Sequence, residues 1–432
     1  MAIDRDARAR PVCAAARGAA AFRKSSDAGP EDGPVRMAPA PGTLWRRAGA
    51  LLSACALGAC GGATAGTSSG GDAGATPGRP FGGPVIAGAL RPGKIPAPLD
   101  PRDIYAAGRP GQLSRVVRHD PALVYVPNSQ SNTVDVISQR TFRIIKHFSV
   151  GTLPQHVTPS WDLRTLFVTN DLGNSLTPID PRTARPGRPI PVLDPYNLYF
   201  TPDGRFAIVV AEAHHELDFR SASTMRLHRA LSIPACAGID HMDYTFDGRY
   251  ALASCEFAAS LVVVDLARQR LTKTIALASG SMPQDVKVSP DGRVFYVADM
   301  AKGGVWKIDA RRMRKIGFIA TGSGAHGLYP SRDSRVLYVS NRGASSVSLV
   351  SFKTRRRVRT WHLPGGASPD MGGLSADGRT LWLSGRYDGA VYAISTRTGH
   401  LLHRIPVGAG PHGLCVWPQP GRYSIGHTGI LR

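Results

Sequence analysis

Residues 289–299 read SPDGRVFYVAD, a polar turn followed by a short apolar strand. Asp and Gly favour a tight turn, and the run Val-Phe-Tyr-Val is typical of a β-strand. Similar strands end as YVPN (125–128), FVTN (167–170), IVVA (208–211), LASC (252–255), YVAD (296–299), YVSN (338–341) and WLSG (382–385). Their final residues are 42, 41, 44, 44, 42 and 44 positions apart, which indicates a repeated structural unit.

Each unit is predicted to contain four short strands. In six units an Asp stands eight residues before the strand end, at Asp162, Asp203, Asp247, Asp291, Asp333 and Asp377. An apolar strand such as 286–288 precedes this turn, and two further strands follow the strand end. Because four strands in about 40–45 residues make a propeller blade, we predict an all-β, seven-bladed β-propeller with four-stranded antiparallel blades.

The end of the chain predicts how the ring closes. Residues 407–416 repeat the beginning of a unit, but no second strand follows them, and the missing part stands at 123–126. We therefore expect the C-terminal strand to pair into the first blade as its innermost strand. This pairing leaves no sheet edge open, whereas a parallel solenoid would need no such closure.

The repeats resemble those of the YVTN repeat family, seven-bladed propellers that include YncE-like proteins. The resemblance covers roughly residues 113–417. It implies the fold, and it implies no single activity, because members of the family bind varied ligands. YncE-like proteins are associated with single-stranded DNA binding, so the resemblance makes this activity one of the candidates.

The residues before the repeats predict export from the cytoplasm. Residues 1–36 lack apolar periodicity and are expected to be disordered or a spurious extension. Residues 37–60 have the layout of a secretory signal, and Leu57-Gly58-Ala59-Cys60 resembles a bacterial lipobox whose Cys60 would be lipidated. A rival match ends at Cys55, and the same segment is also compatible with plain secretion or with a short membrane anchor.

The remaining segments complete the predicted organisation. Residues 61–112 are rich in Gly, Pro and Ala and predict a flexible linker, the propeller spans 113–417, and 418–432 form a C-terminal tail. We expect an extracytoplasmic protein that is secreted or anchored to the outer face of the cell membrane. Its membrane contact would be the N-terminal lipid anchor, and we expect a monomer.

Polar residues recur where the innermost strands begin. His156, Asn197, His241 and Asp285 stand fourteen positions before a strand end, His326 and Asp370 stand fifteen before, and His412 takes the same place in the closing strand. Residues that directly follow a strand end should lie at the same rim of the channel. The expected ligand-binding set at the mouth is therefore His156, Asn197, His241, Asp285, His326, Asp370, His412, Glu212, Glu256, Arg342 and Arg386.

This set suits more than one chemistry. Converging imidazoles and carboxylates can bind a transition metal or transfer protons. The candidate metal ligands are His156, His241, His326 and His412, although their spacing matches no fixed motif such as a zinc ribbon. Propeller channels also hold water, so the same residues could line the channel without any ligand.

Two cysteines are predicted to form a disulfide. Cys236 lies in the loop before His241, and Cys255 ends the strand that pairs beside it. In an oxidising compartment these thiols would join, and the alternative is two reduced, buried thiols.

The charge balance adds a further class of partner. The chain has 53 basic and 31 acidic residues, a formal net charge of +22, which favours an anionic partner or surface. Arginines recur in the first hairpin turns, on the face away from the mouth, where they could contact an anionic surface or nucleic acid, or only solvent.

Three functions remain open at this point. We favour a ligand-binding or scaffold propeller for a small-molecule or cell-envelope ligand, because it requires no chemistry. The first alternative is a propeller enzyme at the same mouth, either a metal-dependent oxidase or a lyase or hydrolase that uses His and carboxylates. The second is binding of single-stranded DNA or another polyanion.

Overall fold

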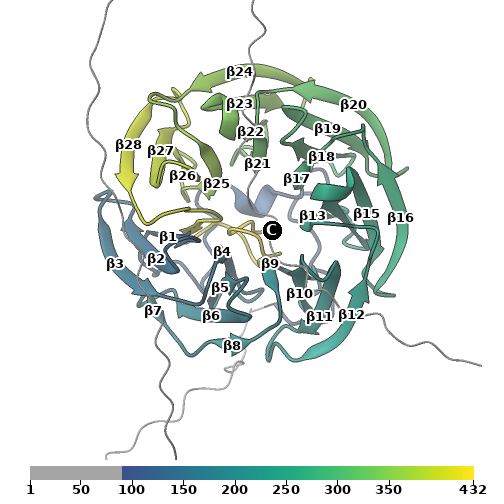
Figure 1. The fold of residues 1–432 in the computed structure, drawn as a ribbon, viewed down its shortest axis with the longest axis horizontal. Coiled ribbons are helices and arrows are strands. Elements are labelled where there is room, and N and C mark those ends of the chain that lie inside the picture. The colour runs from purple at the N-terminus through teal and green to yellow at the C-terminus, as the bar shows by residue number, and fades with distance from the viewer. Residues whose placement is uncertain (1–89) are drawn as a thin grey trace, which may run out of the picture. The chain divides into compact units, whose positions relative to one another are not determined.

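The computed structural model describes residues 90–432. The expected N-terminal extension, the signal segment with Cys60, and the linker up to residue 89 lie outside these residues. In the described part, seven antiparallel sheets surround a central channel, so the predicted seven-bladed propeller is confirmed (Figure 1). No helix among residues 90–432 has the length and apolar character needed to cross a membrane.

The blades are numbered here in chain order, and in each the strand nearest the channel is given first. Blade 1 consists of β29 (Cys415–Trp417), β1 (Leu123–Asn128), β2 (Thr133–Ser138) and β3 (Ile144–Ser149). Blade 2 consists of β4 (Pro154–Pro159), β5 (Leu166–Asn170), β6 (Ser175–Asp180), β7 (Arg185–Pro186) and β8 (Ile190–Pro191). Blade 3 consists of β9 (Pro195–Phe200), β10 (Phe206–Ala211), β11 (Glu216–Ser221) and β12 (Leu227–Ser232).

Blades 4 to 7 follow the same order. Blade 4 consists of β13 (Ile239–Tyr244), β14 (Tyr250–Cys255), β15 (Ser260–Asp265) and β16 (Arg270–Ala276), and blade 5 of β17 (Pro283–Val288), β18 (Val294–Asp299), β19 (Gly304–Asp309) and β20 (Arg314–Ala320). Blade 6 consists of β21 (Ala325–Pro330), β22 (Val336–Asn341), β23 (Ser346–Ser351) and β24 (Arg356–His362). Blade 7 consists of β25 (Pro369–Leu374), β26 (Thr380–Gly385), β27 (Ala390–Ser395) and β28 (Leu401–Pro406). Three short 3-10 helices are η1 (Ala106–Gly108), η2 (Glu256–Ala258) and η3 (Arg342–Ala344).

The repeated Asp residues close the turn between the first two strands of a blade. In blade 5, Ser289 Oγ donates a hydrogen bond to Asp291 Oδ1 (2.6 Å), and the amides of Arg293 and Val294 donate to Ser289 Oγ (3.1 and 3.0 Å). Gly292 adopts a φ of 69°, which glycine reaches without strain. These bonds satisfy the turn's backbone locally, which explains why the motif recurs.

Apolar side chains pack between neighbouring blades. One such layer joins Leu252 and Val263 of blade 4 to Val286 and Val297 of blade 5, all buried. Both faces of the inner strands are covered in this way, so these strands hold a fixed position around the channel.

The outer strand of blade 2 is interrupted. Strands β7 and β8 both pair with β6, and the segment between them contains Gly187 directly after Pro186. Proline has no amide hydrogen to donate to a sheet, so the outer edge of this blade forms two short pieces.

The closing strand is where the sequence predicts it. Strand β29 pairs with β1 in antiparallel register, with Leu123 opposite Trp417 and Tyr125 opposite Cys415. Asp120 belongs to the turn before β1, and its Oδ2 accepts a hydrogen bond from Trp417 Nε1 (2.8 Å). The two ends of the propeller are thus joined by both backbone and side chains.

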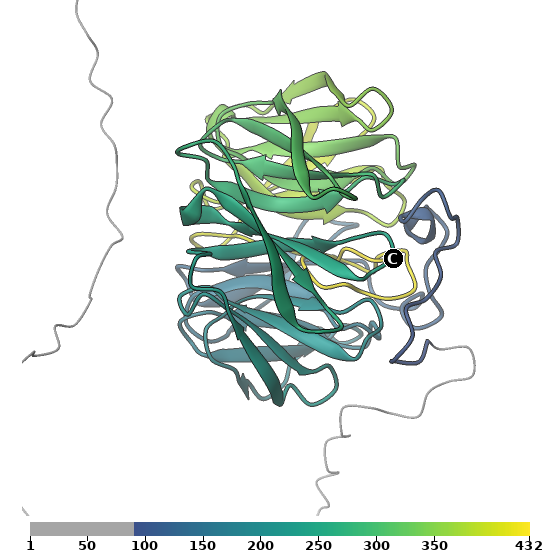
Figure 2. The same ribbon diagram turned by 90° about the vertical axis from the view of Figure 1, so that its right-hand side faces the viewer.

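The prediction of a flexible linker up to residue 112 is wrong for residues 103–108, which pack against the propeller. Ile104 and Tyr105 are each 6 % exposed, and Tyr105 donates a hydrogen bond to the carbonyl of Val288 (2.7 Å). Figure 2 shows this dark blue segment lying across one face of the propeller. The Asp-Gly turns also lie on this face, because the Ile104 amide donates a hydrogen bond to the carbonyl of Pro290 in one of them (2.9 Å). Apolar side chains anchor the segment, which its Gly and Pro content did not indicate.

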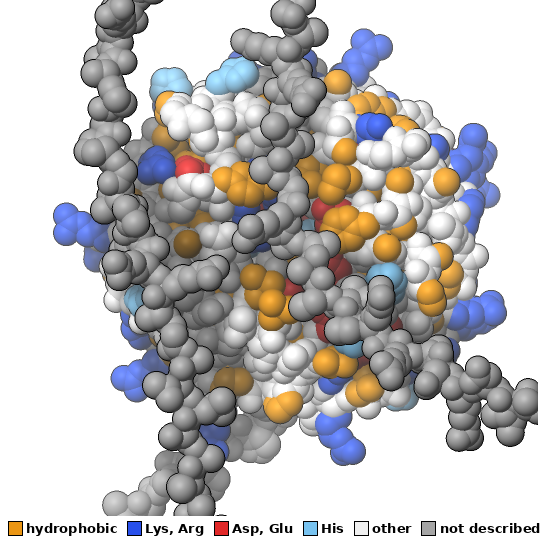
Figure 3. Space-filling view, viewed as in Figure 1, with side chains coloured by type: hydrophobic (Ala, Val, Ile, Leu, Met, Phe, Trp, Pro, Cys, Tyr) orange, Lys and Arg blue, Asp and Glu red, His pale blue; other side chains and the backbone are white. Residues whose placement is uncertain are grey.

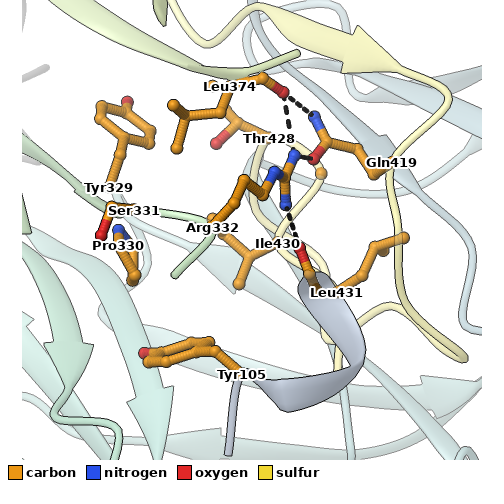
Figure 4. A pocket seen from close by; sticks show the side chains of 13 residues that line it. Tyr105, Tyr329, Pro330, Ser331, Arg332, Leu374, Gln419, Thr428, Ile430 and Leu431 are labelled. Carbon is orange, nitrogen blue, oxygen red and sulfur yellow. Dashed lines mark hydrogen bonds between the residues drawn. The ribbon is translucent and has the colours of Figure 1, made fainter. Parts of the chain in front are cut away.

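The C-terminal tail reaches the same face and the channel. Arg332 connects it to the N-terminal segment: its guanidinium donates to the carbonyls of Gly108 (3.5 Å) and Leu374 (2.9 Å) and to the side chain of Gln419 (Figure 4). Burial lowers the pKa of Arg332 to about 10. The face with the Asp-Gly turns is therefore covered near the channel, while the predicted mouth lies on the opposite face.

The approach of strands inside blade 7 gives a test of the packing. A Cβ on Gly372 would lie 1.8 Å from the carbonyl oxygen of Trp382, whereas a Cβ on Gly373 would meet nothing nearer than 3.4 Å. We expect Gly372→Ala to lower the free energy of unfolding by more than about 3 kcal/mol and Gly373→Ala to change it by less than about 1 kcal/mol, as measured by denaturant titration. Equal losses in the two variants would contradict the described strand pairing.

Candidate functional site

Seven equivalent positions form a ring at the mouth of the channel. Each directly follows the second strand of a blade, in the order Ser129, Asp171, Glu212, Glu256, Met300, Arg342 and Arg386. The acidic members lie on consecutive blades 2 to 4, and the basic members lie on blades 6 and 7. Figure 3 views this face and shows Asp and Glu side chains gathered around its centre. The mouth therefore has an acidic side and a basic side.

The acidic side carries more carboxyl groups than its surroundings neutralise. Burial and the neighbouring Asp194 raise the pKa of Asp171 to about 7. Burial, followed by repulsion from Glu256, Asp171 and Asp194, raises the pKa of Glu212 to about 8. Burial and the charges of Glu256 and Glu212 hold the pKa of Asp240 well above its usual range. A bound cation would favour the ionised form of each of these groups.

On the basic side, Arg342 already forms an ion pair, whereas Arg386 forms none in the described chain. Arg342 donates to Asp370 Oδ1 from Nη2 (2.6 Å) and Nε (3.2 Å). Arg386 donates from Nη1 to Ser129 Oγ (3.2 Å) and Gly410 O (3.5 Å), and no carboxylate of residues 90–432 forms an ion pair with it. Arg386 can therefore bind an anionic group without breaking an existing ion pair.

The predicted histidines lie below this rim, in the wall of the channel. His156 and His241 are 0 % exposed, and His326 and His412 are 2 % exposed. Their ring centroids are close, 4.8 Å apart for His156 and His412 and 6.0 Å apart for His241 and His326. The structure thus brings all four together, as the repeat predicts, but they are buried rather than open at the mouth.

A fifth histidine, which sequence reasoning missed, enters from the tail. His427 is 1 % exposed, and its ring centroid lies 4.7 Å from that of His241 and 6.0 Å from that of His156. No repeat includes residue 427, and the only signal in the sequence was a histidine shortly after the closing strand.

Two groups of three side chains bring possible metal-ligating atoms within 4.8 Å of one another in the described chain: His156, His241 and His427, and His326, Asp370 and His412. Burial lowers the pKa of every histidine in both groups, and that of His156 falls to about 3. At neutral pH these imidazoles are uncharged, so one nitrogen of each has a free lone pair.

Two further residues of the predicted site have structural partners. Asp285 Oδ1 accepts a hydrogen bond from Lys287 Nζ (2.7 Å), and Asp285 Oδ2 accepts one from the Leu328 amide (2.8 Å). Burial alone would raise the pKa of Asp285, but the charge of Lys287, with a smaller contribution from the neighbouring His427 imidazole, outweighs it and holds this pKa well below its usual range. Asn197 Nδ2 lies 3.0 Å from His241 Nδ1, so this amide orients an imidazole.

The predicted disulfide between Cys236 and Cys255 is present. It joins the loop before β13 to the end of β14, directly beside Glu256 on the acidic side. The bond fixes the rim of blade 4 at the point where carboxyl groups repel one another.

The raised pKa of Glu212 predicts how stability depends on pH. The unfolded side chain ionises near its ordinary value of 4.5, whereas the folded one keeps its proton up to about 8, so stability falls as pH rises between these values. Glu212→Gln removes this contribution. We expect thermal denaturation to show the variant close to the parent at pH 4.5 and more stable by roughly 1 kcal/mol or more at pH 8.

Asp333→Asn is the matched control, because Asp333 is exposed on the opposite face. It should retain the difference in thermal midpoint between pH 4.5 and pH 8 that the parent shows. A Glu212→Gln chain that loses stability in parallel with the parent would show that Glu212 ionises normally.

Comparisons with known proteins agree with this architecture. A sequence model of the YNCE-like β-propeller family matches residues 112–420. No curated protein sequence matches the chain.

Among solved structures, hydrazine synthase of Kuenenia stuttgartiensis is similar with 20 % identity and a TM-score of 0.53, covering 60 % of this chain and 87 % of that one. A functionally unknown protein from Desulfotomaculum acetoxidans has 16 % identity and a TM-score of 0.59, covering 68 % and 98 %. Dihydro-heme d1 dehydrogenase NirN in complex with DHE has 18 % identity and a TM-score of 0.54, covering 78 % and 82 %. At such identities the likeness concerns the fold alone, and the match over 112–420 shows that the chain belongs to the YNCE-like β-propeller family.

Proposed function

We propose that this protein is an extracytoplasmic ligand-binding propeller whose mouth binds a small dipolar molecule. The ammonium group of the ligand would lie against the carboxyl groups of blades 2 to 4. Its carboxylate or phosphate group would lie against Arg386 on blade 7. The observation that carries this proposal is the division of charge around the seven equivalent rim positions.

The acidic side suits an organic cation better than a metal ion. None of its carboxyl groups is in either group of three side chains with ligating atoms within 4.8 Å of one another in the described chain. Tyr196 is 8 % exposed, and burial, followed by the neighbouring Asp240, Glu212 and Glu256, raises its pKa well above the usual range. Carboxylates that are spread around an aromatic ring match an ammonium group, which is larger than a bare ion.

The charges of the mouth and the disulfide beside it are consistent with an extracytoplasmic binding protein. The guanidiniums on one side and the carboxyl groups on the other supply charge complementarity, which gives orientation and specificity. The disulfide at Cys236 and Cys255 supports an oxidising location, in agreement with the signal-like segment of the sequence.

A series of linear ω-amino acids of increasing chain length tests this proposal. Each carries one ammonium and one carboxylate group, and the alkylamine and alkanoate of equal length are its controls. We expect one length to raise the thermal midpoint and to bind in calorimetry, because only that length spans both sides of the mouth. At 100 times the dissociation constant the stabilisation should be about 2.7 kcal/mol.

Variants locate the binding. Glu212→Gln and Arg386→Gln should each weaken binding of the selected compound at least about tenfold. The ammonium group of the ligand favours ionisation of Glu212, which Gln cannot undergo, and Arg386→Gln removes a guanidinium charge. Asp333→Asn and Arg379→Gln change the same charges at exposed positions of the opposite face and should leave the affinity unchanged. Binding of the amino acids that is no tighter than that of the single-charge controls would refute a dipolar ligand.

A further inference from the structure

The C-terminal tail places an imidazole near the channel axis through backbone contacts. The amide of His427 donates to the carbonyl of Leu198 (3.1 Å), and its ring stacks on Tyr199 with centroids 5.7 Å apart. A Cβ on Gly426 would lie 2.4 Å from the Leu198 carbonyl oxygen, so only glycine permits this approach. The end of the tail is held by an ion pair between Arg432 and Asp243. The position of His427 is therefore built into the fold.

Four nitrogen atoms of three imidazoles lack a hydrogen-bond partner of normal geometry in the described chain. His156 Nε2, His241 Nε2 and both ring nitrogens of His427 are buried and form no hydrogen bond of normal geometry to residues 90–432. Leaving buried polar atoms unpaired is energetically costly, so such a concentration favours a bound species. These residues are also one of the two groups whose ligating atoms lie within 4.8 Å of one another.

The surrounding hydrogen bonds orient two of the rings. His156 Nδ1 lies 3.0 Å from the carbonyl oxygen of Tyr196, to which it can only donate. The proton of His156 is thus on Nδ1, and the lone pair of Nε2 is free, the arrangement typical of metal-binding histidines. For His241 to bind a metal ion through Nε2, its proton must be on Nδ1, where the Tyr199 hydroxyl oxygen lies at 3.3 Å and can accept it. The Asn197 amide nitrogen, 3.0 Å from Nδ1 in the structure, must then turn away.

Two acidic side chains lie next to this position, and one of them has no basic partner in the described chain. Asp240 Oδ1 lies 3.1 Å from His241 Nε2, and neither oxygen of Asp240 forms a hydrogen bond of normal geometry in the described chain. Asp285 Oδ1 lies 3.3 Å from His427 Nε2. Lys287 Nζ already forms an ion pair with Asp285 (2.7 Å), so Asp240 is the acidic group that would ionise beside a divalent ion among the three imidazoles.

The second group of three is less suited to a cation. Asp370 Oδ1 already accepts hydrogen bonds from Arg342 and lies 3.0 Å from His326 Nδ1, and His412 Nδ1 is 3.0 Å from Gln155 Oε1. The guanidinium of Arg342 beside this group would repel a metal ion. Near the first group the cation is Lys287, which is paired with Asp285 and forms no hydrogen bond to His156, His241 or His427 in the part of the chain described.

We propose that His156, His241 and His427 form a binding site for a divalent transition-metal ion. Imidazole nitrogens favour Zn²⁺, Cu²⁺, Ni²⁺ and Co²⁺ over Mg²⁺ and Ca²⁺, which prefer oxygen ligands. The site lies in the channel below the mouth, and it does not depend on the dipolar ligand proposed there.

Metal retention by the full chain, purified without an affinity tag, tests the site. The chain is stripped with a chelator, loaded with Zn²⁺ or Co²⁺, passed through gel filtration and analysed for metal. We expect one ion per chain, a Co²⁺ absorption spectrum typical of nitrogen coordination, and a higher thermal midpoint with Zn²⁺. His427→Gln and His156→Gln should each lower the affinity at least about tenfold, since each removes one ligand.

Three matched variants make the result specific. His400→Gln changes an exposed histidine outside the channel and should bind the metal normally. His326→Gln should also retain the ion, because His326 belongs to the second group. Glu212→Gln should retain it as well, which separates this site from the mouth. Three results would overturn the proposal: absence of metal from the loaded parent, metal retention by His427→Gln and His156→Gln that equals that of the parent, or loss of metal only in His326→Gln.

Discussion

The pairing of β29 with β1 determines where the most unusual residues of the channel lie. Because β29 is the innermost strand of blade 1, the chain that follows it emerges beside the channel rather than at the outer edge. Residues 418–432 then fold back toward the axis, where Gly426 meets Tyr199 and Arg432 meets Asp243. Ring closure therefore also determines the position of His427. If an outer strand closed the propeller instead, the same tail would lie outside the channel.

Inside the closed ring, burial governs the chemistry of the ionisable groups. It lowers the pKa of the five channel histidines and raises the pKa of Asp171, Glu212 and Asp240 at the mouth. Both effects oppose the charged form, and both make folding less favourable at some pH. Such costs are common where a fold retains polar groups for binding rather than for stability.

The two faces of the propeller use the repeat differently. On the face of the Asp-Gly turns, the same Ser/Thr and Asp side chains close the turn in blade after blade, as at Ser289 with Asp291 and Ser331 with Asp333. At the mouth, equivalent positions carry different residues, from Glu212 and Glu256 to Arg342 and Arg386. Repetition marks positions that maintain the fold, and departures from it mark the positions that can distinguish a ligand.

The repeat pattern was sufficient to predict the number of blades, the closing strand, the Cys236–Cys255 disulfide and the gathering of His156, His241, His326 and His412. The positions of these features follow from a period that places equivalent residues at equivalent heights around a ring, and the disulfide prediction also required an oxidising compartment. The folded chain was needed to show that these histidines are buried, that Asp285 pairs with Lys287, that Ile104 and Tyr105 dock on one face, and that His427 completes a group of three. The reason is physical: a periodic pattern is local information repeated along the chain, whereas the docking of a non-repeating segment depends on the shape of a surface that exists only after the ring has closed.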